Sequence, residues 1–520
     1  MSTPDPSQSG SDLTRRDFLR SSATTALGAG FLASGSEQAH GASKKAVPRN
    51  IIAEENAKPG ALDWQLTRVR LDKADGFRAP DIEGYCSKQS VTAGGKLDLF
   101  VSTKAPRFTI EIFRTGYYGG RGARLMTTLG PFPGKVQPVP PVGAKRLREC
   151  QWEPCVSLTI PEDWVSGVYL GRLTTLPEKP NAPYWQSYIV FIVKDDRPAD
   201  ILVQCSDNTW QAYNRWPDTF SLYDDGKDGW ASGPNVDVSF DRPYGKYRQI
   251  YDNPQSVGSG EWLCFEFPLA YWLEQQGYDV TYCSNSDMIT PERGLKCKTF
   301  ISNGHDEYWD VRQYNSAMSM RDAGVNLLFL SGNSVCWVTP FRDSSSGIPN
   351  RIITRDAPYA GIARQKISDD WKSFEGHTTG PDEGLLMGAI NVLPVNGGGD
   401  WACTKPGHWI FEGTGMKQGD SIPGLVGWEY HGDPAAIAGL EVVAGGTAWQ
   451  NGTNPQEWTA TIYPGPKNNF VFNAATIFWC QGLSSPPGHM LPWSHWSRPH
   501  GPDERVQQIT RNLLARSLAS

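Results

Sequence analysis

The chain lacks the short signatures of several common enzyme classes. Its 520 residues contain no C-x-x-C pair, no H-E-x-x-H and no G-x-S-x-G, which argues against a zinc ribbon, thioredoxin chemistry, a zincin and a serine nucleophile elbow. No apolar run reaches the roughly 18 residues that a membrane-spanning helix needs. The net charge is only −6, so neither nucleic acid nor an anionic membrane is expected as a partner.

The ten cysteines form no recognisable metal-binding or redox pattern. Cys150 and Cys155 flank a short proline-containing loop, and they could form a disulfide in an oxidising compartment. Most of the others are expected to be small buried side chains in apolar strands.

An export signal is predicted at the N-terminus. Arg15 and Arg16 precede Phe18 and Leu19, and a modest apolar region rich in Ala and Gly follows. This is the twin-arginine pattern, so residues 1–45 are predicted to be a signal and linker that take no part in the fold. The mature protein is expected in the periplasm or outside the cell. Twin-arginine export carries proteins that fold beforehand, often around a cofactor, so the signal also hints at a cofactor.

The length predicts at least two domains, because one hydrophobic core stops growing well below 520 residues. Residues 50–196 contain short segments of alternating apolar and polar side chains, such as "FTIEIFRTGYY" and "SYIVFIVKD", separated by Gly and Pro clusters. We predict an immunoglobulin-like β-sandwich here, with Trp164 and Tyr169 on or near a core strand.

Residues 198–518 are predicted to form an α/β domain. Short apolar segments ("ILVQCSD", "YDVTYCS", "CKTFISNG", "NLLFLSGN") alternate with segments of helical spacing that end at Gly277 and Gly324. Such alternation with short joints is typical of a parallel, doubly wound sheet. The stretch from about 340 to 460 is irregular, and an amphipathic helix is predicted near the C-terminus.

The segment Asn303–Trp309 carries the densest group of polar side chains, directly after a predicted buried strand. Because the carboxyl ends of parallel strands share one edge of a sheet, we expect this segment to face the polar ends of other strands in one crevice. Asp207 and Asp287 are expected to be helix caps or turn formers. The other polar strand ends are residues 206–214, 284–287 and 331–334.

The chemistry expected in this crevice is that of oxygen ligands and one imidazole. His305 and Glu307 are candidates for moving protons, and Asp306 for orienting them. A set so rich in carboxylates and phenols also suits a hard cation. The histidines near the C-terminus match no metal-ligand spacing and are expected to have no role; these are His489, His495 and His500. The candidates for substrate binding are Thr209, Trp210, Tyr213, Asn333 and Trp337.

Three segments resemble a known family. They are "SDNTWQAYNRWPDTFSLYD", "NGHDEYWD" and "FLSGNSVCWVT", and they are similar to the C-terminal domain of the large (β) subunit of N,N-dimethylformamidase. The resemblance runs from about residue 200 to 515. It implies a fold similar to class I glutamine amidotransferases, in agreement with the parallel sheet predicted above.

For function, the resemblance implies hydrolysis of a small amide with a non-haem Fe(III) ion, held by two tyrosines and a glutamate. Tyr308 lies in the motif that matches one of these tyrosines. The founding enzyme also has a small partner subunit; the sequence leaves open whether this chain has one or forms a homo-oligomer. The candidates for the second tyrosine are Tyr213, Tyr271, Tyr278 and Tyr282, and those for the glutamate are Glu383 and Glu429.

The leading hypothesis is therefore an exported hydrolase for non-peptide carbon–nitrogen bonds, with iron as its cofactor. The second hypothesis is a secreted, non-catalytic protein that keeps the fold and binds carbohydrate or another surface through Trp-rich loops. The tryptophans concerned are Trp210, Trp216, Trp230, Trp493 and Trp496. The third hypothesis is a metal-free hydrolase that relies on His305 and Asp306.

Overall fold

The computed structural model describes residues 49–519 except 73, 180, 228–232, 247–252, 366–372, 393–396, 451–452 and 493–500. The predicted signal and linker, His495, His500, Trp230, Trp493 and Trp496 lie outside the described residues. Residues Asn50–Ser520 form one compact unit. It is a mixed α/β structure that contains several sheets.

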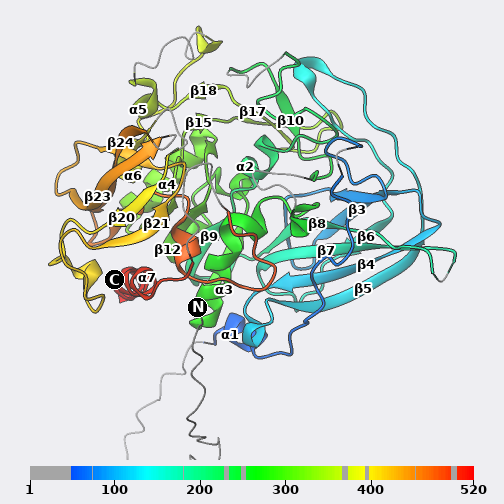
Figure 1. Ribbon diagram of the computed structural model, residues 1–520, viewed down its shortest axis with the longest axis horizontal. Coiled ribbons are helices and arrows are strands. Elements are labelled where there is room, and N and C mark those ends of the chain that lie inside the picture. Colours follow the sequence, from blue (N-terminus) through cyan, green and yellow to red (C-terminus); the bar gives the residue numbers. More distant parts are fainter. Residues whose placement is uncertain are drawn as a thin grey trace, which may run out of the picture. The chain divides into compact units, whose positions relative to one another are not determined.

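Two sheets built from residues 82–194 share one core (Figure 1). Alternate residues of β3, such as Leu97 and Leu99, pack with Ile110 and Ile112 of β4, as the alternating pattern predicts. The larger sheet has the order β2-β8-β7-β4-β5, and the smaller has the order β1-β3-β6. The strands are β1 (Ile82–Cys86), β2 (Ser90–Thr92), β3 (Lys96–Thr103), β4 (Arg107–Thr115), β5 (Ala123–Pro133), β6 (Val156–Thr159), β7 (Gly167–Leu176) and β8 (Gln186–Lys194).

The predicted aromatic pair lies in this core. Tyr169 is on β7 and Trp164 lies just before it. Their rings stack with centroids 5.0 Å apart and planes 10° apart. Both side chains are buried, which confirms their predicted place on or near a core strand.

The second large element is a seven-stranded sheet with the order β11-β9-β12-β14-β25-β24-β23. Its first five strands run parallel, as predicted, but β24 and β23 are antiparallel, so the sheet is mixed. The antiparallel pair comes from the stretch predicted to be irregular, where Gly445 and Gly446 interrupt the apolar alternation. The strands are β9 (Ala199–Gln204), β11 (Val280–Cys283), β12 (Cys297–Gly304), β14 (Asn326–Ser331), β23 (Glu441–Gln450), β24 (Asn454–Pro464) and β25 (Phe470–Asn473).

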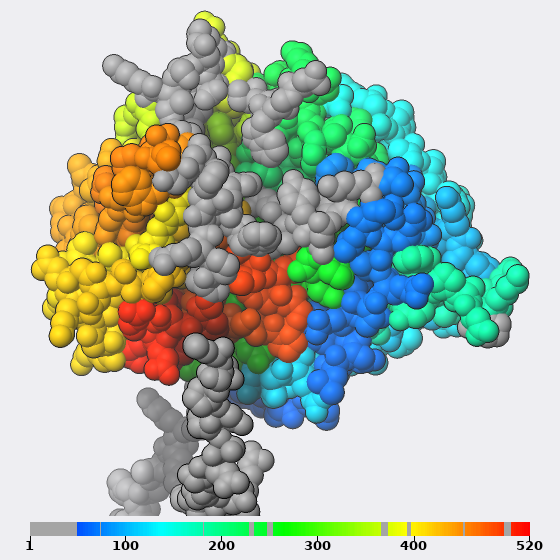
Figure 2. All heavy atoms as spheres, in the orientation of Figure 1, coloured from blue at the N-terminus to red at the C-terminus, as the bar shows by residue number. Residues whose placement is uncertain are grey.

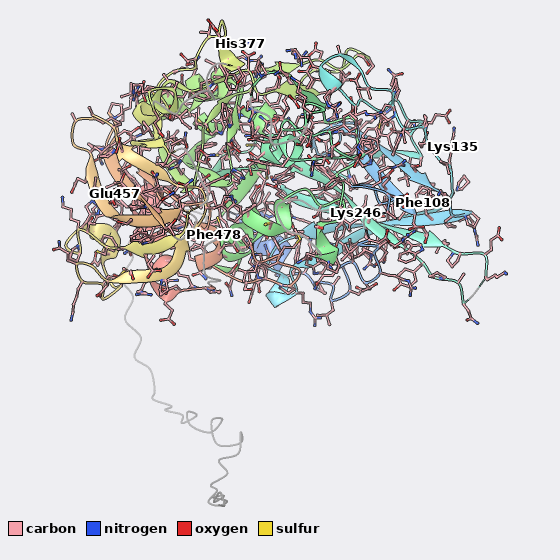
Figure 3. The ribbon with its side chains drawn as sticks, turned by 45° about the horizontal axis from the view of Figure 1, so that its top comes forward. Phe108, Lys135, Lys246, His377, Glu457 and Phe478 are labelled. Atoms are coloured by element: carbon pink, nitrogen blue, oxygen red, sulfur yellow. The ribbon has the colours of Figure 1, made fainter. Side chains whose placement is uncertain are left out.

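The two-sheet region and the β23–β24 pair lie at opposite ends of the compact unit. Phe108 on β4 and Glu457 on β24 mark these ends in Figure 3. The space-filling view agrees, with blue and cyan residues on one side and orange residues on the other (Figure 2). The parallel strands lie between them.

The longer helices end where the sequence predicts. The α3 helix (Phe267–Gln275) follows a π-helical turn (η4, Trp262–Glu266) and gives way to Gly277, whose φ is +78°. The α4 helix (Val311–Ala323) ends at Gly324 with φ +105°. These are left-handed positions that glycine adopts without strain. The C-terminal helix α7 (Glu504–Ala519) contacts β12.

Short elements fill the remaining chain, including the irregular stretch after residue 340. The short helices are α1 (Ile51–Asn56), α2 (Asp207–Ala212), α5 (Ala360–Ala363) and α6 (Gly384–Met387). The short strands are β10 (Asp237–Ser239), β13 (Tyr308–Trp309), β15 (Trp337–Val338), β16 (Phe341–Arg342), β17 (Ile352–Thr354), β18 (Ala357–Pro358), β19 (Ala389–Asn391), β20 (Gly399–Ala402), β21 (Ser421–Val426) and β22 (His431–Pro434).

All ten cysteines lie in the described residues and all are free thiols. The disulfide considered between Cys150 and Cys155 is therefore absent. The two side chains belong to different cores: Cys150 packs with Trp152 and Trp216, whereas Cys155 packs against the core of the two sheets. The Cys155 thiol instead donates a hydrogen bond to the carbonyl of Leu99 at 3.2 Å.

Among the helices in the described part of the chain, none has the length and apolar character needed to cross a bilayer.

Candidate functional site

The predicted crevice begins where β12 ends. Gly304 has φ +66°, and a Cβ there would lie 2.9 Å from atoms of Phe265 and Glu266. Glycine is therefore required both for the turn and for the close approach to η4. The chain leaves the sheet through His305, Asp306 and Glu307 and then enters β13.

His305 lies between two carboxylates. Its Nε2 is 3.1 Å from Oε2 of Glu307 and in close contact with Oε2 of Glu429. All three side chains are buried, and their candidate ligand atoms lie within 4.8 Å of one another. This group could hold a metal ion. The sequence predicts His305 and Glu307 for proton transfer and Glu429 as one of two candidate ligands, and the structure brings all three together.

Two tyrosines also converge on Glu307. The Tyr213 hydroxyl donates to Oε2 at 2.8 Å, and the Tyr223 hydroxyl donates to Oε1 at 3.4 Å. The two hydroxyls are 3.3 Å apart. The indole Nε1 of Trp337 donates to Oε1 at 2.7 Å. Glu307 is thus the centre of the group, with both carboxylate oxygens engaged.

Tyr223 was missed as a candidate, although it is the second-last residue of the first quoted family segment. Its hydroxyl also meets that of Tyr308. The Arg355 guanidinium lies over the Tyr223 ring, 4.3 Å from the centroid. Tyr223 lies 84 positions before Glu307, and its local sequence, "SLYDD", has no feature that marks a ligand. Only the tertiary structure shows its place.

Burial dominates the electrostatics of the group. Desolvation raises the pKa of the Tyr213, Tyr223 and Tyr308 phenols well above the usual range, and the nearby Glu307 charge adds to the effect. Burial also raises the pKa of Glu429. For His305, burial opposes protonation, but the attraction of Glu429 and Glu307 outweighs it and raises the pKa well above normal. The group therefore lies in a low-dielectric place where a cation would be strongly held.

Asp306 is engaged on the other side of the chain. Its carboxylate accepts hydrogen bonds from Gln204 Nε2 at 2.6 Å, Ser302 Oγ at 2.8 Å and Asn285 Nδ2 at 2.9 Å. These donors come from β9, β12 and the turn after β11. Burial raises the pKa of Asp306 to about 6 despite these bonds. The Asp306 carboxylate therefore connects three strand ends through hydrogen bonds, and Asp306 is the residue between His305 and Glu307 in the chain.

The other strand-end acids also tie loops together. Asp287 forms a capping box with Ser284, as expected for a cap. Asp207 is the first residue of α2, but its Oδ1 accepts the Asn285 backbone N–H at 2.7 Å across to the neighbouring strand end. Its role is therefore to join two strand ends, which differs from the predicted cap.

The predicted substrate-binding residues take different positions. Thr209 accepts the Glu307 backbone N–H through Oγ1 at 3.2 Å. Asn333 is buried on the turn after β14 with φ +53°, a left-handed position uncommon outside glycine. In the same turn, the Cys336 and Trp337 backbone N–H groups donate to the Glu307 carbonyl at 2.9 and 3.1 Å. Thr209 and Trp337 therefore hold Glu307 in place.

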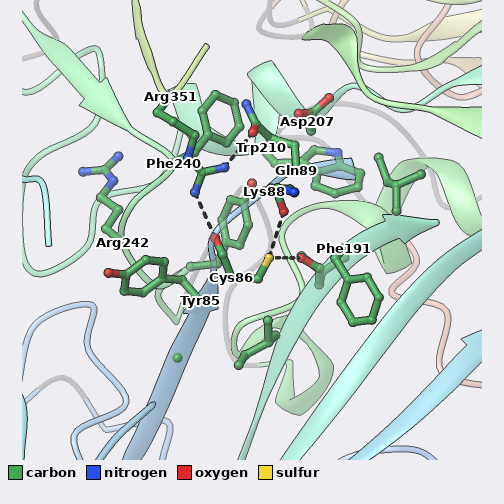
Figure 4. A pocket seen from close by; sticks show the side chains of 15 residues that line it. Tyr85, Cys86, Lys88, Gln89, Phe191, Asp207, Trp210, Phe240, Arg242 and Arg351 are labelled. Atoms are coloured by element: carbon green, nitrogen blue, oxygen red, sulfur yellow. Dashed lines mark hydrogen bonds between the residues drawn. The ribbon is translucent and has the colours of Figure 1, made fainter. Parts of the chain in front are cut away.

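Trp210 contacts Glu266 and lines a small cavity away from Glu307. Its Nε1 donates to buried Glu266 at 2.6 Å, and its ring lines a small cavity with Asp207, Cys86 and Phe191 (Figure 4). The cavity has about 30 Å³ available, which suffices for ordered water. It is too small for an organic substrate. Trp210 and Trp216 are both buried, so neither offers the exposed stacking surface that the carbohydrate-binding hypothesis required.

The remaining side chains considered as metal ligands make contacts away from Glu307. The Glu383 carboxylate accepts backbone N–H groups of Gly361 at 2.6 Å and Asn391 at 3.4 Å. The Tyr282 hydroxyl donates to Glu274 at 3.1 Å. His489 is partly buried, and this burial lowers its pKa to about 4. Tyr271 and Tyr278 pack against aromatic neighbours, Tyr117 and Trp272 respectively.

Comparison with known proteins agrees with the resemblance noted in the sequence. The family model described as N,N-dimethylformamidase beta subunit-like, C-terminal, matches residues 109–492. The match begins inside β4 and so includes much of the two-sheet region, whereas the resemblance in the sequence begins near residue 200. No curated protein matches the chain. Because the matched segment is well over half of the chain, the protein belongs to the N,N-dimethylformamidase beta subunit-like, C-terminal family.

Proposed function

We propose that the protein hydrolyses carbon–nitrogen bonds of small, non-peptide amides with an Fe(III) ion held by Tyr213, Tyr223 and Glu307. The observation that carries the proposal is the convergence of two phenols, the buried Tyr223 and the partly buried Tyr213, on the buried Glu307 carboxylate. Membership of the family supports an amidohydrolase type of activity.

The donor atoms present fit a ferric ion. Two phenolates and a carboxylate are hard oxygen ligands, which trivalent iron prefers. Together they carry three negative charges, which a trivalent cation would neutralise where desolvation otherwise keeps the phenols protonated. A ferric ion bound there supplies Lewis acidity towards an amide carbonyl or a water molecule. The sequence predicts Tyr308 as a ligand, but its hydroxyl bonds to Tyr223 and not to Glu307. We therefore assign the ligand role to Tyr223, which donates to Glu307.

The chain's own residues would handle the protons and the geometry. We assign Glu429 to take a proton from the attacking water and the protonated His305 Nε2 to give one to the leaving nitrogen, after which Glu429 passes its proton back to His305. Glu429 and Glu307 both contact Nε2 and fix its position. Asp306 holds the backbone between these residues, and Thr209 and Trp337 hold Glu307. Asn333 is proposed to orient the amide substrate from the facing turn.

The test combines elemental analysis with visible spectroscopy and an amide panel. Wild-type protein is expected to hold stoichiometric iron with a phenolate-to-iron charge-transfer band. Tyr213→Phe, Tyr223→Phe and Glu307→Gln should each lose iron, the band and amide hydrolysis. Tyr463→Phe is the matched control, because Tyr463 is a buried phenol bonded to the Leu386 carbonyl at 2.6 Å and lies outside the group. Wild-type protein that hydrolyses amides without iron would contradict the metal assignment.

We also propose that the chain is exported through the twin-arginine pathway, on the strength of Arg15 and Arg16. Replacing both arginines with lysine is expected to leave the protein in the cytoplasm, as measured by cell fractionation. Unchanged export of that variant would refute the assignment.

A further inference from the structure

Tyr308 is the third phenol of the group, and its contacts differ from those of the other two. Tyr213 and Tyr223 both donate to Glu307. Within the described part of the chain, the Tyr308 hydroxyl has one hydrogen-bond partner, which is the Tyr223 hydroxyl. The third tyrosine therefore reaches the carboxylate only through Tyr223.

The backbone fixes this arrangement. Tyr308 pairs with Trp337 across β13 and β15, and Asn208 Nδ2 donates to the Tyr308 carbonyl at 2.9 Å. Neighbouring side chains of an extended segment point to opposite sides, so Glu307 and Tyr308 diverge although they are adjacent. The Tyr308 ring is fully buried with Trp337 and Phe341 in one apolar cluster. This apolar packing surrounds the ring, and its hydroxyl contacts Tyr223.

The direction of the hydrogen bond follows from what each hydroxyl can do. Tyr223 either donates its proton to Glu307 or gives it up to bind a cation. In both cases its oxygen has a lone pair that can accept a hydrogen bond, and Tyr308 has no other acceptor among the described residues. The Arg355 guanidinium over the Tyr223 ring places positive charge beside the same phenol. Two groups thus act on Tyr223: the Tyr308 hydroxyl and the Arg355 guanidinium.

We propose that Tyr308 is a positioning residue that donates a hydrogen bond to the Tyr223 oxygen and thereby weakens Tyr223 as an electron donor to the metal. The inference rests on the proposed iron site and deepens it, because it gives the third tyrosine a role outside the ligand set. A hydrogen bond to a ligand oxygen draws electron density from it, and outer partners of this kind tune metal affinity and electronics.

Tyr308→Phe tests the inference in the full-length holoprotein, with Tyr463→Phe as the matched control. Iron per chain, Fe(III) affinity and the position of the charge-transfer band are measured. The variant is expected to bind full stoichiometric iron at saturation, with apparent affinity lowered by no more than about 10–100-fold, because the Tyr223 phenol then has to lose its proton to the metal without the stabilising hydrogen bond. Its band should move to longer wavelength, because loss of the hydrogen bond raises the energy of the filled phenolate orbital. The control should match the wild type in all three measurements.

The other outcomes separate this inference from the proposed function. A wild-type protein without iron or band overturns both. A wild-type band that is lost in Tyr308→Phe at saturating iron means that Tyr308 is itself a ligand, and it overturns only the positioning role. If the charge-transfer band of Tyr308→Phe lies at the wild-type wavelength, Tyr308 does not donate a hydrogen bond to the ligand oxygen. That result also overturns the positioning role of Tyr308.

Discussion

Arg114 on β4 and Glu274 on α3 form a fully buried, two-point ion pair. Nη2 of Arg114 lies 2.8 Å from Oε1 of Glu274, and Nη1 lies 3.0 Å from Oε2. Neither side chain is more than 1% exposed. The pair connects the two-sheet region to α3, whose Leu269 shares a hydrophobic core with Ile201 of the seven-stranded sheet, so the two regions share a buried electrostatic contact.

Arg114→Met is expected to destabilise the protein by about 3–5 kcal/mol, because it leaves the Glu274 charge buried without its cation. The exposed pair Lys135–Glu153 is the control, and Lys135→Met should cost less than about 1 kcal/mol. Urea unfolding of both variants measures the difference. Equal losses in the two variants would show that Arg114 contributes no more than a surface charge.

Local sequence signals identified the strand ends that lie near Glu307. The apolar runs before Ser206, Ser284, Asn303 and Ser331 became the parallel strands or their ends, because a buried parallel strand is a continuous apolar run. The antiparallel strands β24 and β23 were not predicted, because glycines and polar residues interrupt the alternation of apolar and polar side chains in them.

The convergence of side chains on Glu307 could not be predicted in the same way. Tyr213 and Tyr223 lie 94 and 84 positions before it, and their approach depends on how α2 and the following loop cross the sheet edge. The sequence offered four candidate second tyrosines, one of which, Tyr213, reaches Glu307. Tyr223 was not among them, because periodicity does not report distances between segments that are far apart in the chain.

Asp207 makes stability depend on pH. Burial raises its pKa to about 8 from an ordinary value of 3.8, so the native state keeps a proton that the unfolded chain releases within this window. The free energy of unfolding is therefore expected to fall as pH rises from about 4 to 8, by up to about 1.4 kcal/mol per pH unit. Asp207→Asn removes the ionisation, so its urea stability at pH 8 should fall less from its value at pH 5. Parallel pH curves for the two proteins would contradict this.

The free thiols can be counted. After unfolding without a reductant, iodoacetamide is expected to add to all ten cysteines, as measured by mass spectrometry. In the native protein Cys155 should react first, because it is partly exposed whereas the other nine cysteines are buried. Its reaction should still be slow, since burial raises its pKa to about 12. Eight adducts after unfolding, with Cys150 and Cys155 unmodified, would instead show a disulfide.

Glu429 and Glu383 were equal candidates in the sequence, and the structure separates them. Glu429→Gln should lower kcat by about 10²–10⁴-fold, the usual contribution of proton transfer, while iron content stays unchanged, because Glu429 contacts His305. Glu383→Gln should leave kcat and iron content unchanged, because the Glu383 carboxylate is bonded to the backbone of Gly361 and Asn391, away from His305 and Glu307. Iron analysis and amide kinetics of the two variants form a matched pair. Loss of iron in Glu429→Gln would place Glu429 among the ligands.

Removal of iron should weaken the whole fold, because the proposed ligands come from segments far apart in the chain. Tyr213 follows α2, Tyr223 lies in the next loop, and Glu307 follows β12. An ion that binds only the folded state adds about 2.7 kcal/mol when its free concentration is 100 times the Kd. Chelation is therefore expected to lower the Tm, and Fe(III) should restore it. The Glu307→Gln variant provides the control, since chelator and iron should leave its Tm unmoved. A chelator effect of equal size in that variant would mean that the ion binds elsewhere in the protein.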